Sequence, residues 1–172
     1  LERSHLSHAE YSSLLEEEIY RGMTRSELGN LVPGVGEQVE VQWVKLLSLI
    51  DPESISNPGP SGEEIRQRLL VEDFGAVARE VSRNTVYADS SGYVGWVPKG
   101  AFPFLDDLLF GTEDKAPLAL GEISDPVHSL EGVFLLRVIR GPEERQIFGP
   151  VREALKDTAL EEWIAGQIRL GT

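Results

Sequence analysis

Cysteine is absent from this 172-residue chain, and several kinds of site are excluded with it. Without thiols the protein has no disulfide bond, no thiol nucleophile and no zinc–thiolate centre. The three histidines, His5, His8 and His128, are scattered and do not show the spacing of metal ligands. We therefore expect no metal ion and no other cofactor.

Basic residues and long apolar runs are also scarce. The 16 Lys and Arg residues stand against 29 Asp and Glu residues, a net charge of −13 that leaves few cations to bind phosphates. We therefore expect no nucleic-acid partner. No apolar run approaches the ~20 residues that span a bilayer. Because the chain begins at Leu1 rather than Met, we expect an excised or processed piece, with any membrane anchor upstream of it.

The patterns that are present predict one domain with helical extensions. A capping box at Ser7–Glu10 predicts a helix that runs to about Met23. Gly22 and Gly29 weaken this helix, and we expect a loop over residues 30–36. Further helices are predicted from a second capping box at residues 61–64 and over residues 72–80, 102–110 and 150–168.

Strands are predicted where strand-forming residues run between turn signals. Residues 39–50 begin with strict alternation, which places Trp43 and Lys45 on one face of a strand. In Ser91–Gly100, Gly92 and Gly95 permit a positive φ or a close backbone approach. That stretch suits either a core strand with a glycine bulge or the floor of a shallow cleft. Residues 133–139 predict a central strand, Pro126 an edge strand, and residues 141–149 a linker.

Five short pieces stand in a fixed order in the middle of the chain. They are VEDFGAVAREVS (71–82), SGYVGWV (91–97), PF (103–104), LGEISDPV (120–127) and EGVF (131–134). Together they resemble a parvulin-type peptidyl-prolyl cis-trans isomerase (rotamase) domain of the extracytoplasmic foldase kind. The resemblance covers about residues 39–140.

The resemblance implies an α+β fold: a small, mostly antiparallel four-stranded sheet covered by helices, plus N- and C-terminal helices. We expect an N-terminal helical extension over residues 1–36 and a parvulin-like domain over residues 37–140. Residues 141–172 would supply a C-terminal helix that packs with the N-terminal helix. In foldases of this kind such flanking helices form a chaperone lobe.

The resemblance also implies an apolar seat for a proline ring. Prolyl isomerisation transfers no group; its barrier of ~18–20 kcal/mol reflects the lost amide resonance, and catalysis must favour the twisted amide. Phe104 takes the position of the family's pocket phenylalanine and Val94 that of a leucine. Trp43, or Lys45 if the register shifts by two, takes that of the first histidine.

The family's polar cluster is replaced throughout. Asn84 stands about where the family has cysteine or aspartate, and Phe134 replaces the second histidine. The aromatic residues either fill the core or form a larger, apolar cleft for peptide. We assign no catalytic residue and predict these substrate-binding residues: Trp43, Lys45, Asn84, Val94, Phe104 and Phe134.

We therefore predict a parvulin-like foldase or chaperone domain that binds unfolded or proline-containing polypeptide, with weak or absent prolyl isomerase activity. An active peptidyl-prolyl cis-trans isomerase is the alternative, and a non-catalytic partner-docking domain is the second. Whether the domain is an enzyme stays open at this point. The resemblance implies an extracytoplasmic location, at a cell surface or in a periplasm-like compartment.

Overall fold

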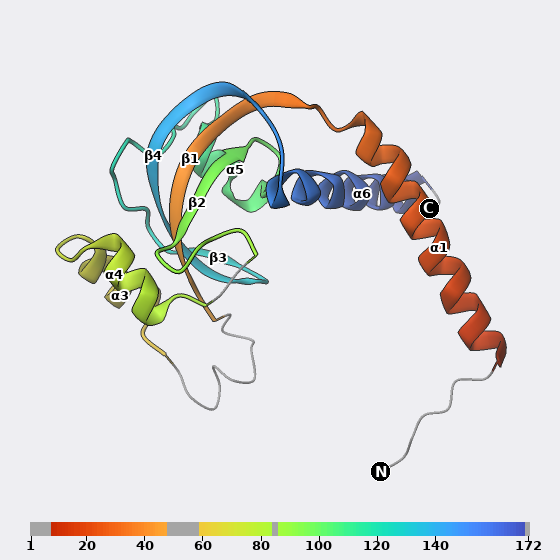
Figure 1. The fold of residues 1–172 in the computed structure, drawn as a ribbon, viewed down its shortest axis with the longest axis horizontal. Coiled ribbons are helices and arrows are strands. Elements are labelled where there is room, and N and C mark those ends of the chain that lie inside the picture. The colour runs from red at the N-terminus through yellow and green to blue at the C-terminus, as the bar shows by residue number, and fades with distance from the viewer. Residues whose placement is uncertain (1–7, 48–58, 84–85, 171–172) are drawn as a thin grey trace, which may run out of the picture.

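A curved four-stranded antiparallel sheet with helices on both faces forms the centre of the protein (Figure 1). The computed structural model describes residues 8–47, 59–83 and 86–170. The α+β class is confirmed, as are the central position of the strand at residues 133–139 and the edge strand that follows Pro126. In sheet order the strands are β2 (Tyr93–Pro98), β1 (Val35–Leu46), β4 (Gly132–Gln146) and β3 (Val127–Ser129).

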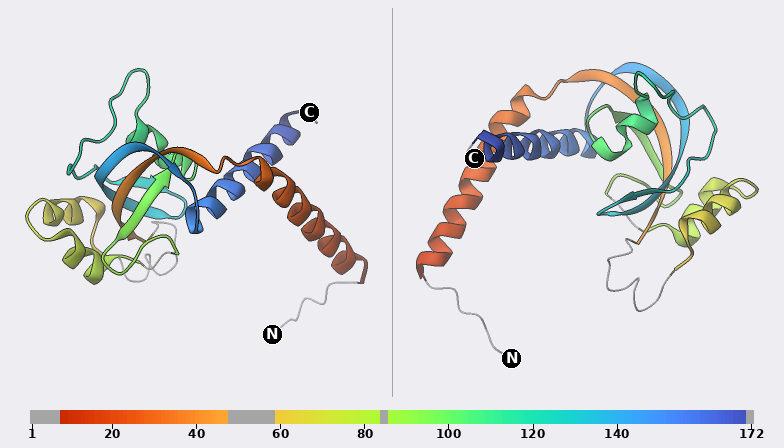
Figure 2. Two further views of the ribbon diagram at one scale, coloured as in Figure 1. Left: turned by 45° about the horizontal axis from the view of Figure 1, so that its top comes forward. Right: turned by 180° about the vertical axis from the view of Figure 1, so that it is seen from behind.

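The helices lie on both sides of this sheet and beyond it. The described helices are α1 (His8–Leu31), α3 (Gly62–Leu69), α4 (Phe74–Val81), α5 (Pro103–Phe110) and α6 (Pro150–Leu170). The sheet arches over α5 and the start of α6, while α3 and α4 lie on its other side (Figures 1 and 2). The capping box predicted at Ser61 and Glu64 is present and begins α3. No helix in the described part of the chain is long and apolar enough to cross a membrane.

Alternation along β1 divides the core into two clusters, one on each face of the sheet. Val41 and Trp43 pack with Leu105 on the face that α5 and α6 cover, which we call the α5–α6 face. Val44 packs with Phe74 on the opposite face, which we call the α3–α4 face. Because side chains point to alternate faces of a strand, one strand supplies both cores.

The first helix is longer than predicted. It continues through Gly22 and Gly29 to Leu31, so the loop expected over residues 30–36 is shortened to residues 32–34. Contacts with α6 explain the extension: a Cβ at Gly29 would lie 3.0 Å from the Lys156 side chain, so glycine allows a close approach of the two helices. Arg25 donates to Asp157 across the same contact. Tertiary contacts thus outweigh the low helix propensity of glycine.

The predicted linker over residues 141–149 is reduced to residues 147–149, because β4 continues to Gln146. Its last residues pair with β1 from Val35 to Gln38. Pro142, in a cis peptide bond with Gly141, lies where the β1–β4 register shifts, and a proline is tolerated in a sheet at such irregularities. The sheet therefore extends past both ends of residues 37–140, and the division into three segments stays a prediction.

Candidate functional site

A cavity of about 140 Å³ lies on the α5–α6 face of the sheet. Trp43 and Lys45 enter it from β1, Phe134 from β4 and Phe104 from α5. These are four of the six predicted binding residues. Its full lining is Trp43, Lys45, Val86, Tyr87, Phe102, Phe104, Glu131 and Phe134.

Strand register brings the β1 and β4 side chains together. Lys45 stands directly opposite Phe134 in the antiparallel β1–β4 pair. Since residues two apart share a face, Trp43 lies on the same side as Lys45. The choice between these two for the first family position therefore does not alter the site, because both line the cavity.

Gly92 fixes the position of Trp43 from the other side. The Trp43 amide donates a 2.8 Å hydrogen bond to the Gly92 carbonyl. Gly92 has φ +76°, and a Cβ built there would lie 2.3 Å from the Trp43 carbonyl oxygen. Only glycine fits this approach, which confirms the close backbone contact expected in this stretch.

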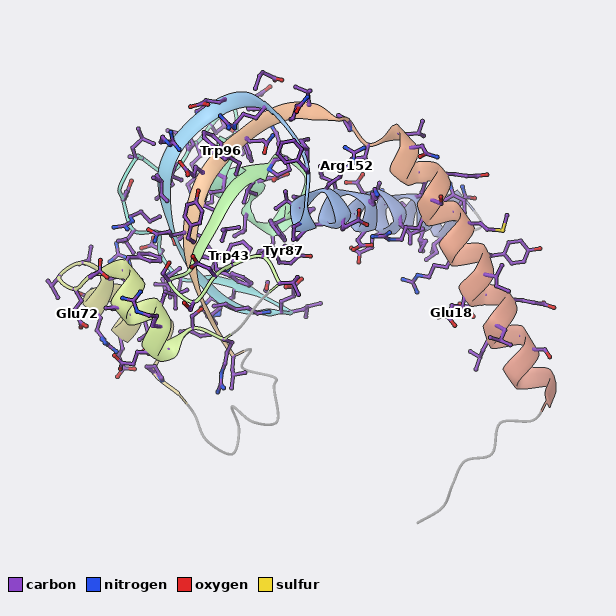
Figure 3. All side chains as sticks on the ribbon, in the orientation of Figure 1. Glu18, Trp43, Glu72, Tyr87, Trp96 and Arg152 are labelled. Atoms are coloured by element: carbon purple, nitrogen blue, oxygen red, sulfur yellow. The ribbon has the colours of Figure 1, made fainter. Side chains whose placement is uncertain are left out.

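The cavity floor is a cluster of rings in edge-to-face contact. The ring centroid of Trp43 lies 5.3 Å from that of Phe102, 5.4 Å from that of Phe134 and 6.2 Å from that of Tyr87. Trp43 is 1% exposed and Phe134 is 2% exposed. The core reading therefore applies to both rings, and the same rings also bound the cavity. Figure 3 shows Trp43 and Tyr87 near each other beside the sheet.

Polar groups at the cavity are few. The Lys45 Nζ lies 3.7 Å from the Glu131 carboxylate and 5.6 Å from the centre of the Phe134 ring. Burial raises the pKa of the Tyr87 hydroxyl, and the nearby carboxylates of Glu131 and Asp157 raise it further. No described lining residue is a histidine, cysteine, aspartate, serine or threonine. The polar groups of the described lining are therefore the Lys45 amine, the Glu131 carboxylate and the Tyr87 hydroxyl.

Two predicted binding residues lie elsewhere. Val94 packs against the same core but lines a neighbouring groove rather than the cavity. Asn84 lies outside the described residues. His128, which stands on the edge strand β3, is exposed and does not line the cavity.

Tyr87 and Phe102 are site residues that sequence reasoning missed. Tyr87 lies in a polar stretch without helix or strand periodicity, yet its ring lies 4.9 Å from that of Phe102. Phe102 is the residue before the first turn of α5 and is 6% exposed. The pair of phenylalanines around Pro103 was a usable signal, because the bend before a helix can turn both rings toward one cavity.

A larger hollow of about 570 Å³ adjoins the cavity and shares Tyr87, Phe102, Phe104 and Glu131 with it. Its remaining walls come from α1 and α6, which Arg25 joins through ion pairs to Glu153 and Asp157. The terminal helices therefore border the same site as the sheet. Among the described residues, no group of three His, Asp or Glu side chains is placed to hold a metal ion.

Comparisons with known proteins agree with the motifs. No family model matches the chain. It is 31% identical over 100 residues to the foldase protein PrsA of Oceanobacillus iheyensis, covering 57% of this chain and 31% of that protein. It is 37% identical over 79 residues to the foldase protein PrsA of Caldanaerobacter subterraneus, covering 45% of this chain and 24% of that protein. The middle of the chain is a parvulin-like domain.

A solved structure, the peptidylprolyl isomerase PrsA from Bacillus anthracis, aligns with 91% of this chain and 66% of its own. The TM-score is 0.49 and the sequence identity 16%. In the two sequence comparisons, the matched part of this chain spans less than a third of the length of each PrsA foldase. What the parvulin-like domain binds is argued below from its own residues.

Proposed function

We propose that the parvulin-like domain binds unfolded or proline-containing polypeptide as part of a foldase or chaperone. The observation that carries this proposal is the cavity between Trp43, Phe104 and Phe134. An apolar cavity of roughly 150 Å³ suffices to hold benzene, so a cavity of about 140 Å³ has room for one proline ring. Rings that are already packed against one another need little reordering on binding.

We further propose that prolyl isomerase activity is weak or absent. Rate acceleration needs contacts that are stronger with the twisted amide than with either planar isomer. An apolar floor binds the proline ring of both isomers similarly. Besides the Tyr87 hydroxyl, the polar groups of the described lining are the charged pair of Lys45 and Glu131, whose two partners largely neutralise each other. We also propose an extracytoplasmic location, supported by the resemblance to extracytoplasmic foldases.

Two variants of α5 test the proline seat. Phe104 and Phe110 are both half-buried against the same core, but only Phe104 lines the cavity. In an amide-shift titration with a proline-containing octapeptide, signals of Trp43 and Phe104 should move. Phe104→Ala should weaken binding about tenfold, whereas Phe110→Ala should leave it unchanged. Equal losses in both variants, or unmoved signals, would refute the seat.

The isomerase question has its own measurement. Exchange spectroscopy on the same peptide reports the cis–trans rate with and without the protein. We expect little acceleration at protein concentrations that saturate the peptide. A strong acceleration that Phe104→Ala abolishes would establish an active isomerase. Suppression of aggregation of an unfolded model protein then tests the chaperone activity, which a domain that docks only one partner would not show.

A further inference from the structure

A second groove, of about 440 Å³, lies beside the proline seat at the edge strand β2. Apolar and aromatic side chains form most of its wall, and Phe148 is 68% exposed there. Its lining is Gln38, Tyr87, Val94, Trp96, Glu144, Arg145, Gln146, Phe148, Pro150 and Val151. The parvulin motifs account for only Val94 and Trp96 in this groove, and the proline seat uses neither.

Hydrogen bonds and ring contacts hold the groove walls in place. The buried Gln38 amide donates to the carbonyls of Arg145 and Gln146, at 2.8 and 3.1 Å, and so fixes the end of β4. The Arg145 guanidinium lies 4.2 Å from the centre of the Trp96 ring and pairs with Glu143. The Gln38 amide and the Arg145 guanidinium are therefore already paired, and the rings and apolar side chains supply most of the remaining surface.

Tyr87 joins the groove to the proline seat, because its side chain lines both. The groove also follows β2, beyond which no described strand pairs. An extended polypeptide rises about 3.3 Å per residue. Because a single side chain, Tyr87, borders both, a proline in the cavity and a side chain in the groove would be only a few residues apart in an extended chain.

We propose that the groove of Val94, Trp96 and Phe148 is a second subsite, which takes a large apolar or aromatic side chain of the same polypeptide. This inference rests on the proposed function, since the proline seat supplies the continuity. It makes the preferred substrate an extended segment with two anchors, a proline and a nearby aromatic residue. Tyr87 is the specificity residue between the two subsites and sets their separation.

The three tryptophans allow each region to be observed separately. Trp43 lines the proline seat, Trp96 lines the groove, and Trp163 is 43% exposed on α6 outside both. Incorporation of 5-fluorotryptophan gives a fluorine signal for each, assigned with single Trp→Phe variants. The probes are octapeptides with one proline and a phenylalanine two, three or four positions before or after it. Alanine replaces the phenylalanine in the control peptide.

We expect the control peptide to shift the Trp43 signal alone. A peptide with phenylalanine on the correct side should shift Trp43 and Trp96 together and bind about tenfold more tightly. Trp163 should not respond to either peptide. Trp96→Ala should abolish the gain from phenylalanine without weakening the control peptide, and Phe148→Ala, a change at an exposed side chain, should reduce the gain with no effect on folding.

The outcomes separate the groove from the seat. A Trp43 response with no gain from phenylalanine at any position overturns the groove and leaves the proline seat standing. A gain that persists in both Trp96→Ala and Phe148→Ala also overturns the groove. If no peptide moves Trp43, the proposed function itself fails. Trp163→Ala is the matched variant, and a loss of affinity there would show that the tryptophan effects are unspecific.

Discussion

The same strands form both faces of the sheet, but buried polar side chains form hydrogen bonds on one face, and aromatic rings bound a cavity on the other. On the α3–α4 face, the buried Glu40 carboxylate accepts hydrogen bonds from Arg140 and Tyr93, and Arg137 donates to Gln42. On the α5–α6 face, aromatic rings bound a cavity. The first face thus combines a packed apolar cluster with paired polar groups, whereas the second keeps a cavity beside packed rings. Under the proposed function, this cavity is the binding site.

The largest effect on stability should come from a substitution of Gly92, whose backbone lies against that of Trp43. Gly92→Ala should lower the free energy of unfolding by about 3 kcal/mol or more, because a left-handed residue acquires a Cβ and a clash with the Trp43 carbonyl. Gly121, at φ +78° with nothing within 4 Å of its Cβ position, is the control. Gly121→Ala should cost about 1 kcal/mol. Urea unfolding measures both, and similar losses would contradict the close approach.

Neighbouring residues of β4 test the faces directly. Leu135 is fully buried on the α3–α4 face. Leu135→Ala should therefore lower the free energy of unfolding by about 2–5 kcal/mol. The peptide affinity of the folded protein should not change. Phe134→Leu, on the α5–α6 face, should cost only about 1 kcal/mol yet weaken peptide binding about fivefold. Equal effects of both variants on peptide affinity would contradict the proposal that peptide binds on the α5–α6 face alone.

The polar network of the α3–α4 face predicts a pH dependence. The Arg140 guanidinium, followed by the Tyr93 hydroxyl, holds the pKa of Glu40 below its ordinary value of 4.5. A depressed carboxyl pKa in the folded state stabilises the fold above the ordinary pKa, and this stabilisation disappears as pH falls through the folded-state value. Glu40→Gln should therefore cost about 1–2 kcal/mol at pH 7, a figure reduced because the Arg140 side chain is 63% exposed.

The difference between wild type and Glu40→Gln should shrink steadily below about pH 4.5. Thermal unfolding across a pH series measures it. Peptide affinity at pH 7 serves as the control and should be the same in both proteins. A destabilisation that stays constant down to acid pH would show that the carboxylate charge is not what stabilises this face.

The smallest effect on stability should come from the ion pair at the cavity. Glu131 is 58% exposed in its pair with Lys45, so Lys45→Met should change the free energy of unfolding by less than about 1 kcal/mol. The same variant replaces the cation above Phe134 with an apolar chain and should change peptide affinity more than stability. Calorimetry of binding and of unfolding compares the two. A large loss of stability with unchanged peptide affinity would show that this ion pair stabilises the fold and takes no part in binding.

Local signals in the sequence predicted the elements that local chemistry decides. The capping box at Ser61 and Glu64 begins a helix, and alternation placed Trp43 and Lys45 on one face. The family positions then brought Phe104 and Phe134 to the same cavity. These predictions succeeded because period and capping are properties of a few neighbouring residues.

The missed features depend on contacts between distant residues. Gly29 continues a helix because α6 packs on it, and β4 continues past Pro142 because the start of β1 pairs with it. Tyr87 enters the cavity from a stretch without periodicity, so no local pattern marks it. In each case tertiary contact outweighed the local preference of glycine, proline or loop residues.

The joining of the chain's two ends has a consequence for synthesis on the ribosome. Arg25 meets Asp157 across 132 positions, and Gln38 binds the carbonyl of Arg145 across 107. Helix α1 and strand β1 must wait for partners that are translated 132 and 107 positions later. Contacts of such long sequence separation slow folding. During that interval the nascent domain exposes apolar surface, so a protein proposed to protect unfolded chains itself passes through a stage that needs protection.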